Sequence, residues 1–238
     1  MSEAEELLSI NPAPLSKKYR KKEVVGGYVK TPFAIRLDGV GFSKVFKGER
    51  VREKRIHDSL VDAAIYLMRR YGADVGFVSS DEISIAFLRN LPYGGRVFKI
   101  VSVPASIVSS VVSLRLGKPV FFDARVIQFS NAFEILEYIK YRMRVTGGNF
   151  LSSLYARKLG KQRQMPTVIE MYRVLATENL EYEDWMLYGT CIVPEIVEKE
   201  GINRKTGEKV RYLRRVYTAV SSYRTCISRI KRLTYNML

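Results

Sequence analysis

The sequence is poor in the side chains that build zinc centres. It contains one histidine, His57, and two cysteines, Cys191 and Cys226, among 238 residues. One histidine excludes a histidine-based zinc centre within a single chain, and two cysteines exclude a cysteine-rich zinc site. The two cysteines allow at most one disulfide. We expect His57, which lies in a predicted helix, to be a surface residue without a catalytic function.

Long uncharged segments are scarce as well. The longest runs from Ile100 to Leu114, and its 15 residues include five serines and one proline. This run is too short and too polar to span a bilayer. The chain starts with Met-Ser-Glu-Ala-Glu-Glu, which is acidic where a secretory signal is basic. We therefore expect a cytoplasmic protein without a membrane partner.

Negative charge is scarce compared with positive charge. Forty Lys and Arg against 24 Asp and Glu give a net charge of +16, while 47% hydrophobic residues exclude a disordered basic tail protein. From Arg204 to Leu238, ten Lys or Arg stand against one acid, Glu208, so a net charge of +9 lies in the last 35 residues. Such a field attracts polyanions, most commonly nucleic acid. A generally basic surface is the alternative.

The hydrophobic pattern predicts an ordered succession of strands and helices. Strands are predicted over residues 33–37, 73–78, 83–88 and 121–129, and helices over residues 49–71 and 96–116. The tight turn Ser79-Ser-Asp-Glu joins the second and third strands into a hairpin. This βαββαβ order predicts an α+β fold, a ferredoxin-like palm whose antiparallel sheet carries helices on one face.

The rest of the chain is predicted to be an appendage to this palm. Residues 3–9 fit a short helix and residues 11–22 a loop. Three helical segments follow the palm, over residues 132–146, 149–160 and 167–176, and then two strands over residues 186–193 and 210–220. We expect a catalytic domain over residues 1–130. Residues 131–238 would form a helical, basic C-terminal part with a strand pair, packed on the palm.

Two aspartates end neighbouring elements of the predicted sheet. Asp38 follows the first strand, and Asp81 lies in the hairpin turn. In a split βαβ sheet the first strand neighbours that hairpin, so the two carboxylates meet at one edge. Two aspartates with a main-chain carbonyl suit Mg²⁺, and two such ions serve phosphoryl-group displacement. Each motif alone is also typical of an ordinary turn, but the paired layout is that of polymerase and cyclase palms.

Three sequence blocks resemble those of the tRNA-His guanylyltransferase family. They read Ile35-Arg-Leu-Asp-Gly-Val-Gly-Phe-Ser-Lys, Ser80-Asp-Glu-Ile-Ser and Phe122-Asp-Ala-Arg-Val-Ile, and their order and spacing agree with that family over about Lys30 to Val220. The resemblance implies a palm enzyme that adds nucleotides to the 5′ end of tRNA in the 3′-to-5′ direction. ATP would activate the 5′-phosphate, and the 3′-hydroxyl of GTP would then attack it.

The resemblance also implies roles for particular residues. Asp38 and Asp81 would be catalytic and, with the main chain of Gly39, would hold two Mg²⁺ ions. Lys47, Arg96 and Lys99, which the resemblance places at the triphosphate, could instead be solvated charges at helix ends. The residues implied to bind the nucleoside triphosphate are Asp38, Gly39, Val40, Gly41, Phe42, Ser43, Lys47, Ser80, Asp81, Arg96 and Lys99.

The expected RNA contacts lie mostly outside the palm. Arg125 matches the third block and Asn149 lies in the following helical segment, while Arg211, Arg214 and Arg215 flank a predicted hairpin and alternate with tyrosines. Arginines suit phosphates and tyrosines stack on bases. A solvated strand face or a charged sheet edge is the alternative for the hairpin arginines. By resemblance, the partner is tRNA and the assembly is a homo-oligomer, a tetramer.

One segment departs from the eukaryotic members of that family. Where they carry His-Ile-Asn-Asn-Leu-Tyr-Asn-Thr, this chain reads Gly147-Gly-Asn-Phe-Leu-Ser-Ser-Leu-Tyr, and a Lys-Pro-Asn-Asp block is replaced by Lys47-Gly-Glu-Arg. The chain therefore resembles the prokaryotic, guanylyltransferase-like branch, which uses a template base and repairs 5′-truncated tRNA. A nucleotide cyclase on the same palm and a non-catalytic RNA-binding module are the rival hypotheses.

Overall fold

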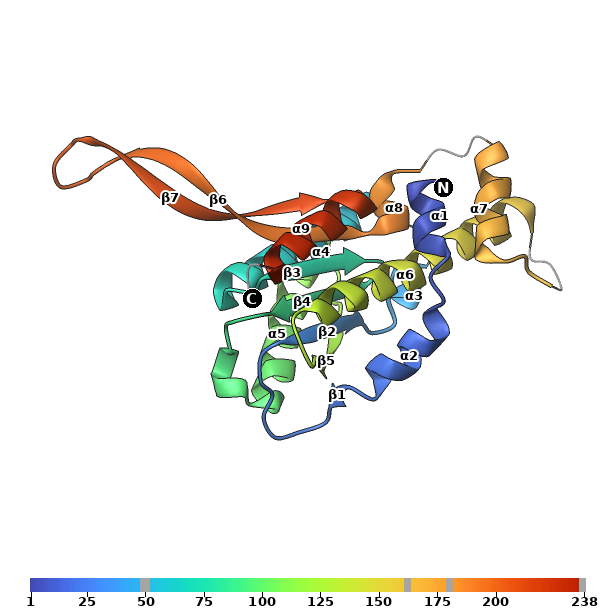
Figure 1. Ribbon diagram of the computed structural model, residues 1–238, viewed down its shortest axis with the longest axis horizontal. Helices are drawn as coiled ribbons and strands as arrows, with labels where there is room; N and C mark the ends of the chain where they lie inside the picture. The colour runs from blue at the N-terminus through green and yellow to red at the C-terminus, as the bar shows by residue number, and fades with distance from the viewer. Residues whose placement is uncertain (48–51, 161–163, 179–181, 236–238) are drawn as a thin grey trace.

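A single antiparallel sheet organises the molecule. The computed structural model describes residues 1–47, 52–160, 164–178 and 182–235. Within these residues, seven strands pair in the order β1-β5-β2-β4-β3-β6-β7 (Figure 1). The strands are β1 (Glu23–Val24), β2 (Phe33–Gly39), β3 (Val75–Ser79), β4 (Glu82–Phe87), β5 (Phe122–Gln128), β6 (Thr190–Ile202) and β7 (Lys209–Val220).

The central four strands confirm the predicted palm. Strand β2 pairs with β5 on one side and with β4 on the other, and β3 and β4 form the expected hairpin. Helix α4 (Lys54–Tyr71) connects β2 to β3, and α5 (Val97–Leu116) connects β4 to β5. Gly72 ends α4 with a φ of 64°, a left-handed conformation that favours glycine.

Helices α4 and α5 cover one face of the sheet. Every second residue of β2, namely Phe33, Ile35 and Leu37, is buried in the core that these helices complete. Helix α5 is long and apolar enough to cross a membrane by length and composition alone. It packs against α4 and β5, a position also taken by core helices in proteins without membrane spans.

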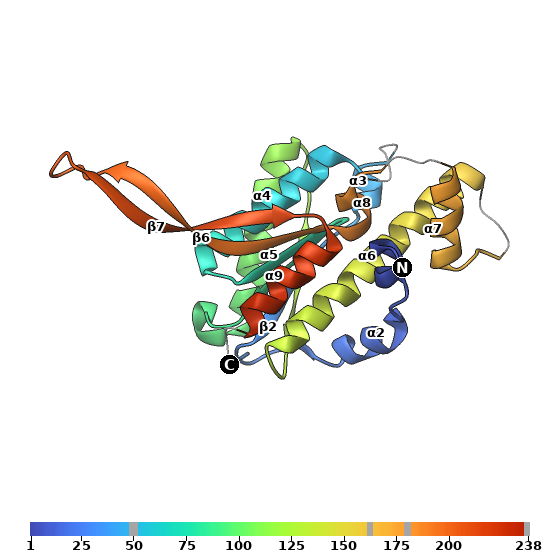
Figure 2. The same ribbon diagram turned by 45° about the horizontal axis from the view of Figure 1, so that its top comes forward.

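The appended helices cover the opposite face. Helix α6 crosses this face, α9 lies beside it, and α1 and α2 from the N-terminus pack against α6 (Figure 2). The α6 side has its own hydrophobic core. The remaining helices are α1 (Glu3–Leu8), α2 (Pro12–Arg20), α3 (Phe42–Val45), the 3₁₀ turn η1 (Pro92–Gly95), α6 (Phe133–Leu159), α7 (Val168–Thr177), α8 (Asp184–Tyr188) and α9 (Tyr223–Tyr235).

Several predicted boundaries were wrong for identifiable reasons. Residues 12–20 form α2 rather than a loop, because Asn11 caps the helix by accepting from the Ala13 N–H and Pro12 occupies its first position. The segments predicted over 132–146 and 149–160 form one helix, α6, which continues through Gly147 and Gly148. A Cβ at Gly147 would lie 2.6 Å from the Leu187 carbonyl oxygen. The glycine therefore allows α8 to approach α6 closely.

The strand pair near the C-terminus is longer than predicted and joins the same sheet. Residues 184–188 form α8, and β6 starts only at Thr190. The β6–β7 hairpin then projects far beyond the other strands (Figure 1). Helix α9, which no sequence pattern above predicts, is tied to the base of β6 by the Cys191–Cys226 disulfide. Helix α4 starts at Lys54 rather than at residue 49, and residues 48–51 lie outside the described part.

Candidate active site on the sheet

The fold brings the two predicted carboxylates to one edge of the sheet. Asp38 lies near the end of β2, where its cross-strand neighbour on β4 is Glu82. Asp81 lies in the β3–β4 turn, and its carbonyl oxygen accepts a hydrogen bond of 2.9 Å from the Gly39 N–H. Ser80, the first residue of that turn, has a φ of 58°. Antiparallel pairing of β2 with β4 is therefore what places Asp38 beside Asp81.

Asp38 lies in an acidic environment. Asp123 is its cross-strand neighbour on β5. Burial raises the pKa of the Asp38 carboxyl, Arg36 opposes the shift, and the nearby charges of Glu82, Asp81 and Asp123 add to it. Because the carboxylates repel one another in the absence of a cation, the position favours binding of positive charge.

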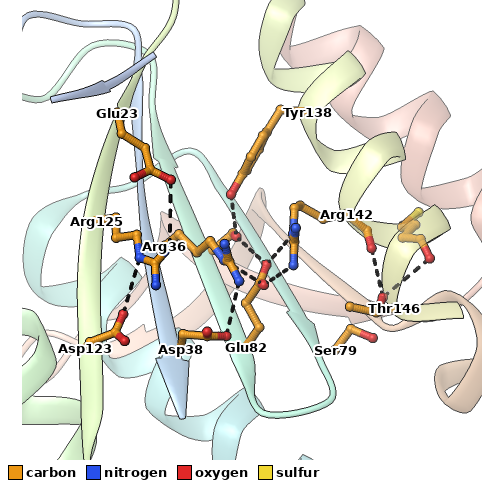
Figure 3. Close-up of polar contacts among 12 residues, drawn as sticks. Glu23, Arg36, Asp38, Ser79, Glu82, Asp123, Arg125, Tyr138, Arg142 and Thr146 are labelled. Atoms are coloured by element: carbon orange, nitrogen blue, oxygen red, sulfur yellow. Dashed lines mark hydrogen bonds and ion pairs between the residues drawn. The ribbon is translucent and has the colours of Figure 1, made fainter. Parts of the chain in front are cut away.

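A buried ion network fixes the side of this site that faces α6. Glu82 is 2% exposed, and one of its carboxylate oxygens accepts from Arg142 Nε at 2.8 Å. Its other oxygen accepts from Arg36 Nε at 2.8 Å and from Arg142 Nη2. Arg36 also reaches the Asp38 carboxylate, at 3.3 Å. Figure 3 shows the two arginines converging on Glu82 from β2 and α6.

The network continues into the core through two hydroxyl groups. Ser84 lies 3.2 Å from the Glu82 carboxylate and 3.3 Å from the Tyr138 hydroxyl of α6. Burial raises the pKa of Tyr138 above its usual value, so this phenol stays neutral. The Glu82 carboxylate also raises the pKa of Arg142, against the lowering effect of burial. Glu82 is therefore fully engaged in holding α6 on the sheet.

An arginine-lined pocket adjoins the network. It lies among α2, α6 and the strands β1, β2 and β5, and four arginines together with three tyrosines form much of its wall. Arginine side chains of this density bind phosphate groups well. The lining residues are Ser16, Tyr19, Arg20, Glu23, Arg36, Arg125, Ile127, Tyr138, Tyr141 and Arg142.

The loop after β2 is shaped by its glycines. A Cβ at Gly39 would lie 2.4 Å from the Phe42 ring, and Gly41 has a φ of 67°. Phe42 is buried against Phe46 and Phe122, whereas Val40 and Ser43 are exposed. The main chain of this loop is therefore open to a ligand while its aromatic side chain anchors it in the core. Lys47, after α3, is exposed as well.

Next to Asp81 lies a further arginine, Arg52, which the sequence pattern did not identify. Arg52 donates to the Thr146 carbonyl oxygen at 3.0 Å and reaches Ser79 Oγ at 3.4 Å. No carboxylate of the described residues lies within ion-pair distance of it. Burial lowers the pKa of Arg52 to about 10, and the Asp81 charge opposes this shift. Arg52 thus connects the start of α4 to α6 and to the end of β3.

His57 is buried, which corrects the expectation of a surface residue. It is 5% exposed, stacks on Trp185 with ring centroids 4.4 Å apart, and makes a 2.8 Å hydrogen bond to Thr190 Oγ1 through Nε2. Burial, with a contribution from Arg52, lowers the pKa of His57 to about 4. Its Nδ1 has no hydrogen-bond partner in the part of the chain described. The histidine is therefore a neutral core residue beneath β6.

Two predicted nucleotide ligands lie away from the site. Strand β4 runs from the site at Glu82 to Phe87 at the opposite end, so α5 starts at that opposite end with Arg96 and Lys99. The helix returns to the site end only at Leu116, about 30 Å further along its axis. The structure therefore does not bring Arg96 and Lys99 to the carboxylates.

The predicted RNA contacts fall in three places. Arg125 lies on β5 beside Asp123 and Glu23 and lines the arginine pocket. Asn149 is exposed on α6, three residues beyond the Thr146 that Arg52 contacts. The arginines at 211, 214 and 215 lie on the β6–β7 hairpin, which leaves the sheet at the end opposite Asp38.

The oxygen ligands at the site fit Mg²⁺. Asp38, Asp81 and the main chain of Gly39 supply hard oxygen donors, and Glu82 is occupied by arginines. Among the described residues, no three His, Cys, Asp or Glu side chains are grouped so that they could hold a metal ion by themselves. A Mg²⁺ ion that keeps its waters and binds substrate phosphates needs only one or two protein carboxylates. The donor set is therefore adequate for such ions.

Comparison with known proteins identifies the family. The family model for tRNAHis guanylyltransferase matches residues 17–132, the segment that carries all three sequence blocks and the carboxylates. Over these residues the chain belongs to the tRNAHis guanylyltransferase family. It is accordingly an enzyme, a nucleotidyltransferase of that family.

Solved structures of similar proteins extend the match beyond that segment. A bacterial tRNA(His) guanylyltransferase-like protein in complex with GTP is 22% identical with a TM-score of 0.69, over 94% of this chain and 97% of that one. The tRNA(His) guanylyltransferase of Saccharomyces cerevisiae is 18% identical with a TM-score of 0.61, over 74% and 91%. These matches show that the fold is shared by both parts of the chain.

A viral relative covers a similar range. An uncharacterized protein of Acanthamoeba polyphaga mimivirus is 24% identical over 243 residues, which is 83% of this chain and 82% of that protein. Its name assigns no activity, so it adds a relative and no function.

Some residues of this guanylyltransferase-family site had a sequence signal and others had none. Glu82 directly follows Asp81 in the second block, and Arg36 precedes Asp38 by two residues, the spacing that puts both on one face of a strand. Arg52 and Arg142 come from segments that only the tertiary fold joins to these strands. No local pattern marks either of them.

Proposed function

We propose that this enzyme adds a nucleotide to the 5′ end of tRNA in the 3′-to-5′ direction. ATP would activate the 5′-phosphate with release of pyrophosphate, and the 3′-hydroxyl of GTP would then attack that phosphate and release AMP. The observation that carries the proposal is the meeting of Asp38 and Asp81 at one sheet edge, next to a pocket lined by arginines. Both reacting groups are polyanions, and this edge offers sites for cations and for phosphates.

Different groups of the protein would bind the metal ions and the triphosphate. Asp38, Asp81 and the main chain of Gly39 would hold Mg²⁺, which when bound neutralises phosphate charge and lowers the pKa of an attacking hydroxyl. The exposed loop main chain at Val40 and Gly41 would contact a triphosphate. Lys47 follows this loop in the sequence, and Ser80 lies in the adjoining β3–β4 turn. One similar bacterial protein was solved in complex with GTP and another structure holds ATP.

The arginine pocket would receive the phosphorylated RNA end. Arg125 lines the pocket, and its ion pairs with the described residues are long, 3.8 Å to Glu23 and 3.6 Å to Asp123. Its guanidinium can therefore exchange them for a phosphate. Arg36 and Arg142 are held by Glu82 and supply a fixed positive wall. Asn149, exposed near the site end of α6, would contact the RNA beyond the first nucleotide.

Substrate choice would follow the guanylyltransferase-like branch. The stretch from Gly147 to Tyr155 lacks the histidine of the eukaryotic block, which favours templated repair of 5′-truncated tRNA beside addition to tRNA-His. We further propose that residues 1–130 perform the chemistry and residues 131–238 bind RNA. A cytoplasmic homo-oligomer, by resemblance a tetramer, would use the outward face of α5, where Phe98 and Leu114 are exposed.

The decisive experiment supplies 5′-monophosphorylated tRNA-His, and the same tRNA lacking its first nucleotide, with ATP, Mg²⁺ and each nucleoside triphosphate in turn. We expect GTP-dependent addition at the 5′ end. Asp38→Asn and Asp81→Asn should each lower the rate at least about a hundredfold. Asp58→Asn is the matched control, because Asp58 is exposed on α4 and pairs only with Lys54 in the structure described. A cyclic product from GTP alone, or full activity of Asp38→Asn, would contradict the proposal.

A further inference from the structure

The β6–β7 hairpin is an arm with two chemically different faces. We call residues 196–202 of β6 and 209–215 of β7 the arm. Cross-strand partners in an antiparallel pair point to the same side, and successive pairs alternate. One face therefore carries the pairs Ile196 and Arg215, Glu198 and Leu213, Glu200 and Arg211, and Ile202 and Lys209. The other carries Val197 and Arg214, Lys199 and Tyr212, and Gly201 and Val210.

Contacts at the base of the hairpin identify the two faces. Tyr217 belongs to the first set by register, and its hydroxyl donates to the Met68 carbonyl oxygen of α4 at 2.9 Å. Glu195 belongs to the second set and pairs with Arg229 of α9 at 2.6 Å. We therefore name the first the α4-side face and the second the α9-side face.

The α4-side face neutralises most of its own charge, because its three basic residues stand against the two acids Glu198 and Glu200. Arg211 pairs with Glu200 at 3.2 Å, and Glu198 adds a second acid to this face. Arg215 is drawn back to the body of the protein, where it donates to the Ala73 carbonyl oxygen at 2.9 Å and lies 3.6 Å from Asp74. Two of the three hairpin arginines expected to bind RNA are thus engaged within the protein.

The α9-side face keeps its positive charge. Lys199 and Arg214 are exposed diagonal neighbours, and this face of the arm contains no acid. Tyr212 lies opposite Lys199 and covers Gly201, where a Cβ would be 3.1 Å from the ring. The glycine leaves space for the tyrosine ring to lie against the strand. Its outward surface is therefore available for contact, since Tyr212 is 44% exposed.

The same side of the sheet continues this charge on α9. Helix α9 buries Cys226 and Ile230 against the body, and it exposes Lys231 and Arg232 in its last turns. Glu195, the acid nearest the base of the α9-side face, is occupied by Arg229 and by the Thr218 hydroxyl. The basic surface therefore extends from the arm towards the body without a free acid between Lys199 and that base.

We propose that the α9-side face of the arm, centred on Lys199, Arg214 and Tyr212, binds the phosphate backbone of the RNA substrate, and that the α4-side face does not. The inference rests on the proposed function for the identity of the RNA. Lysine and arginine without neighbouring acids attract phosphates, and a flat exposed tyrosine accepts a sugar or base. The surface is shallow and follows a straight ribbon, which suits a backbone more than a folded acidic protein.

Two double variants with the same change in net charge test the inference. Lys199→Gln with Arg214→Gln removes two charges from the α9-side face, and Lys209→Gln with Arg211→Gln removes two from the α4-side face. The dissociation constant for 5′-monophosphorylated tRNA is measured against salt concentration for both and for the unmodified chain. We expect the first pair to weaken binding about tenfold and to reduce the salt slope by about 1 to 2. The second pair should change binding less than about threefold.

Further measurements separate this inference from the proposed function. Affinity for GTP should remain unchanged in both double variants, because the arm leaves the sheet at the end opposite Asp38. Tyr212→Ala should weaken tRNA binding without changing the salt slope. Equal losses in the two double variants, or stronger effects on binding of poly-glutamate than of tRNA, would overturn the assignment of the face. Absence of nucleotide addition by the unmodified enzyme would instead overturn the proposed function, whatever the arm binds.

Discussion

The two faces of the central sheet are built from the same strands and do different things. On the α4 and α5 side, β2 and β4 bury Ile35, Leu37 and Ile85 in an apolar core. On the α6 side, the residues of the same strands near the site are charged or polar, Arg36 and Glu82 among them, and those further from it join a second apolar core. One face therefore stabilises the fold through hydrophobic burial. The other adds to its apolar core a buried ionic cluster, in which Arg142 of α6 and Arg36 of β2 neutralise Glu82.

We call the ionic cluster on the α6 side the polar face; its members are held by pairing of opposite charges, next to the apolar core of the same side. Glu82 is 2% exposed and binds both Arg36 and Arg142. Such a cluster adds little net stability compared with an apolar core, but removal of one member leaves an uncompensated buried charge. The comparison predicts that substitutions on the two faces lower the free energy of unfolding through different mechanisms.

The largest expected effect is on the polar face. Glu82→Ala leaves Arg36 and Arg142 buried without their shared carboxylate, so the free energy of unfolding should fall by about 4 kcal/mol. Urea denaturation measures this loss. In the double variant Glu82→Leu with Arg142→Met, one of the two arginines is removed together with the acid, and part of the loss should be recovered. A loss below about 1 kcal/mol for Glu82→Ala would show that the pair is not buried as described.

On the apolar face the expected loss is somewhat smaller and has another cause. Ile35→Ala removes buried methyl groups and leaves a cavity between β2 and the helices, which should lower the free energy of unfolding by about 3 kcal/mol. The folded fraction should keep its affinity for nucleoside triphosphate, because Ile35 points away from Asp38. Ile35→Val is the matched control and should cost about 1 kcal/mol. A loss of nucleotide affinity in folded Ile35→Ala would contradict the separation of the two faces.

His57 sharpens the comparison, because it is a titratable group buried on the otherwise apolar side. Its pKa is lowered to about 4 in the folded state, against about 6.5 when unfolded. The unfolded chain therefore binds more protons between these values. Stability from this group should be complete above about pH 6.5 and should fall by about 2 kcal/mol between pH 7 and pH 5.

The variant His57→Gln should lack this component of the pH dependence. Urea denaturation at pH 7 and pH 5 is compared for both chains, so that carboxylate contributions common to both cancel. The unmodified chain should lose about 2 kcal/mol more than the variant over this interval. Equal losses would mean that His57 is solvated in the folded protein.

The smallest effect is expected at the exposed rim of the polar face. Asp123 is half exposed, and its ion pair with Arg125 spans 3.6 Å. Asp123→Asn should therefore change the free energy of unfolding by less than about 0.5 kcal/mol. It should alter the Mg²⁺ concentration needed for activity far less than Asp38→Asn does. A stability loss comparable with that of Glu82→Ala would remove the distinction between the rim and the interior of this face.

Much of the palm could be predicted from sequence because its information is local. Alternating residues such as Ile35 and Leu37 identify a strand, and the short turn at Ser80 and Asp81 forces a hairpin. With the βαββαβ order, these features place β2 beside β4 and so bring Asp38 to Asp81. The error for residues 12–20 was also local, because Asn11 and Pro12 form a helix start that outweighs the polar composition.

The remainder depended on contacts between distant segments. Arg142 reaches Glu82 over 60 positions and Arg52 reaches Thr146 over 94, and no periodicity specifies which helix will cross which strand. Likewise, the burial of His57 follows from its placement against Trp185 and Thr190. A helical pattern alone could not reveal these two neighbours.

The sequence by itself determined the order of the elements, the juxtaposition of the two aspartates and the concentration of positive charge near the C-terminus. Tertiary structure decided which charges remain available. Arg211 and Arg215 are paired within the protein whereas Arg214 is exposed on the α9-side face, although all three belong to one basic run. The physical reason is that net charge is a property of composition, while its neutralisation depends on strand register and on distances across the fold.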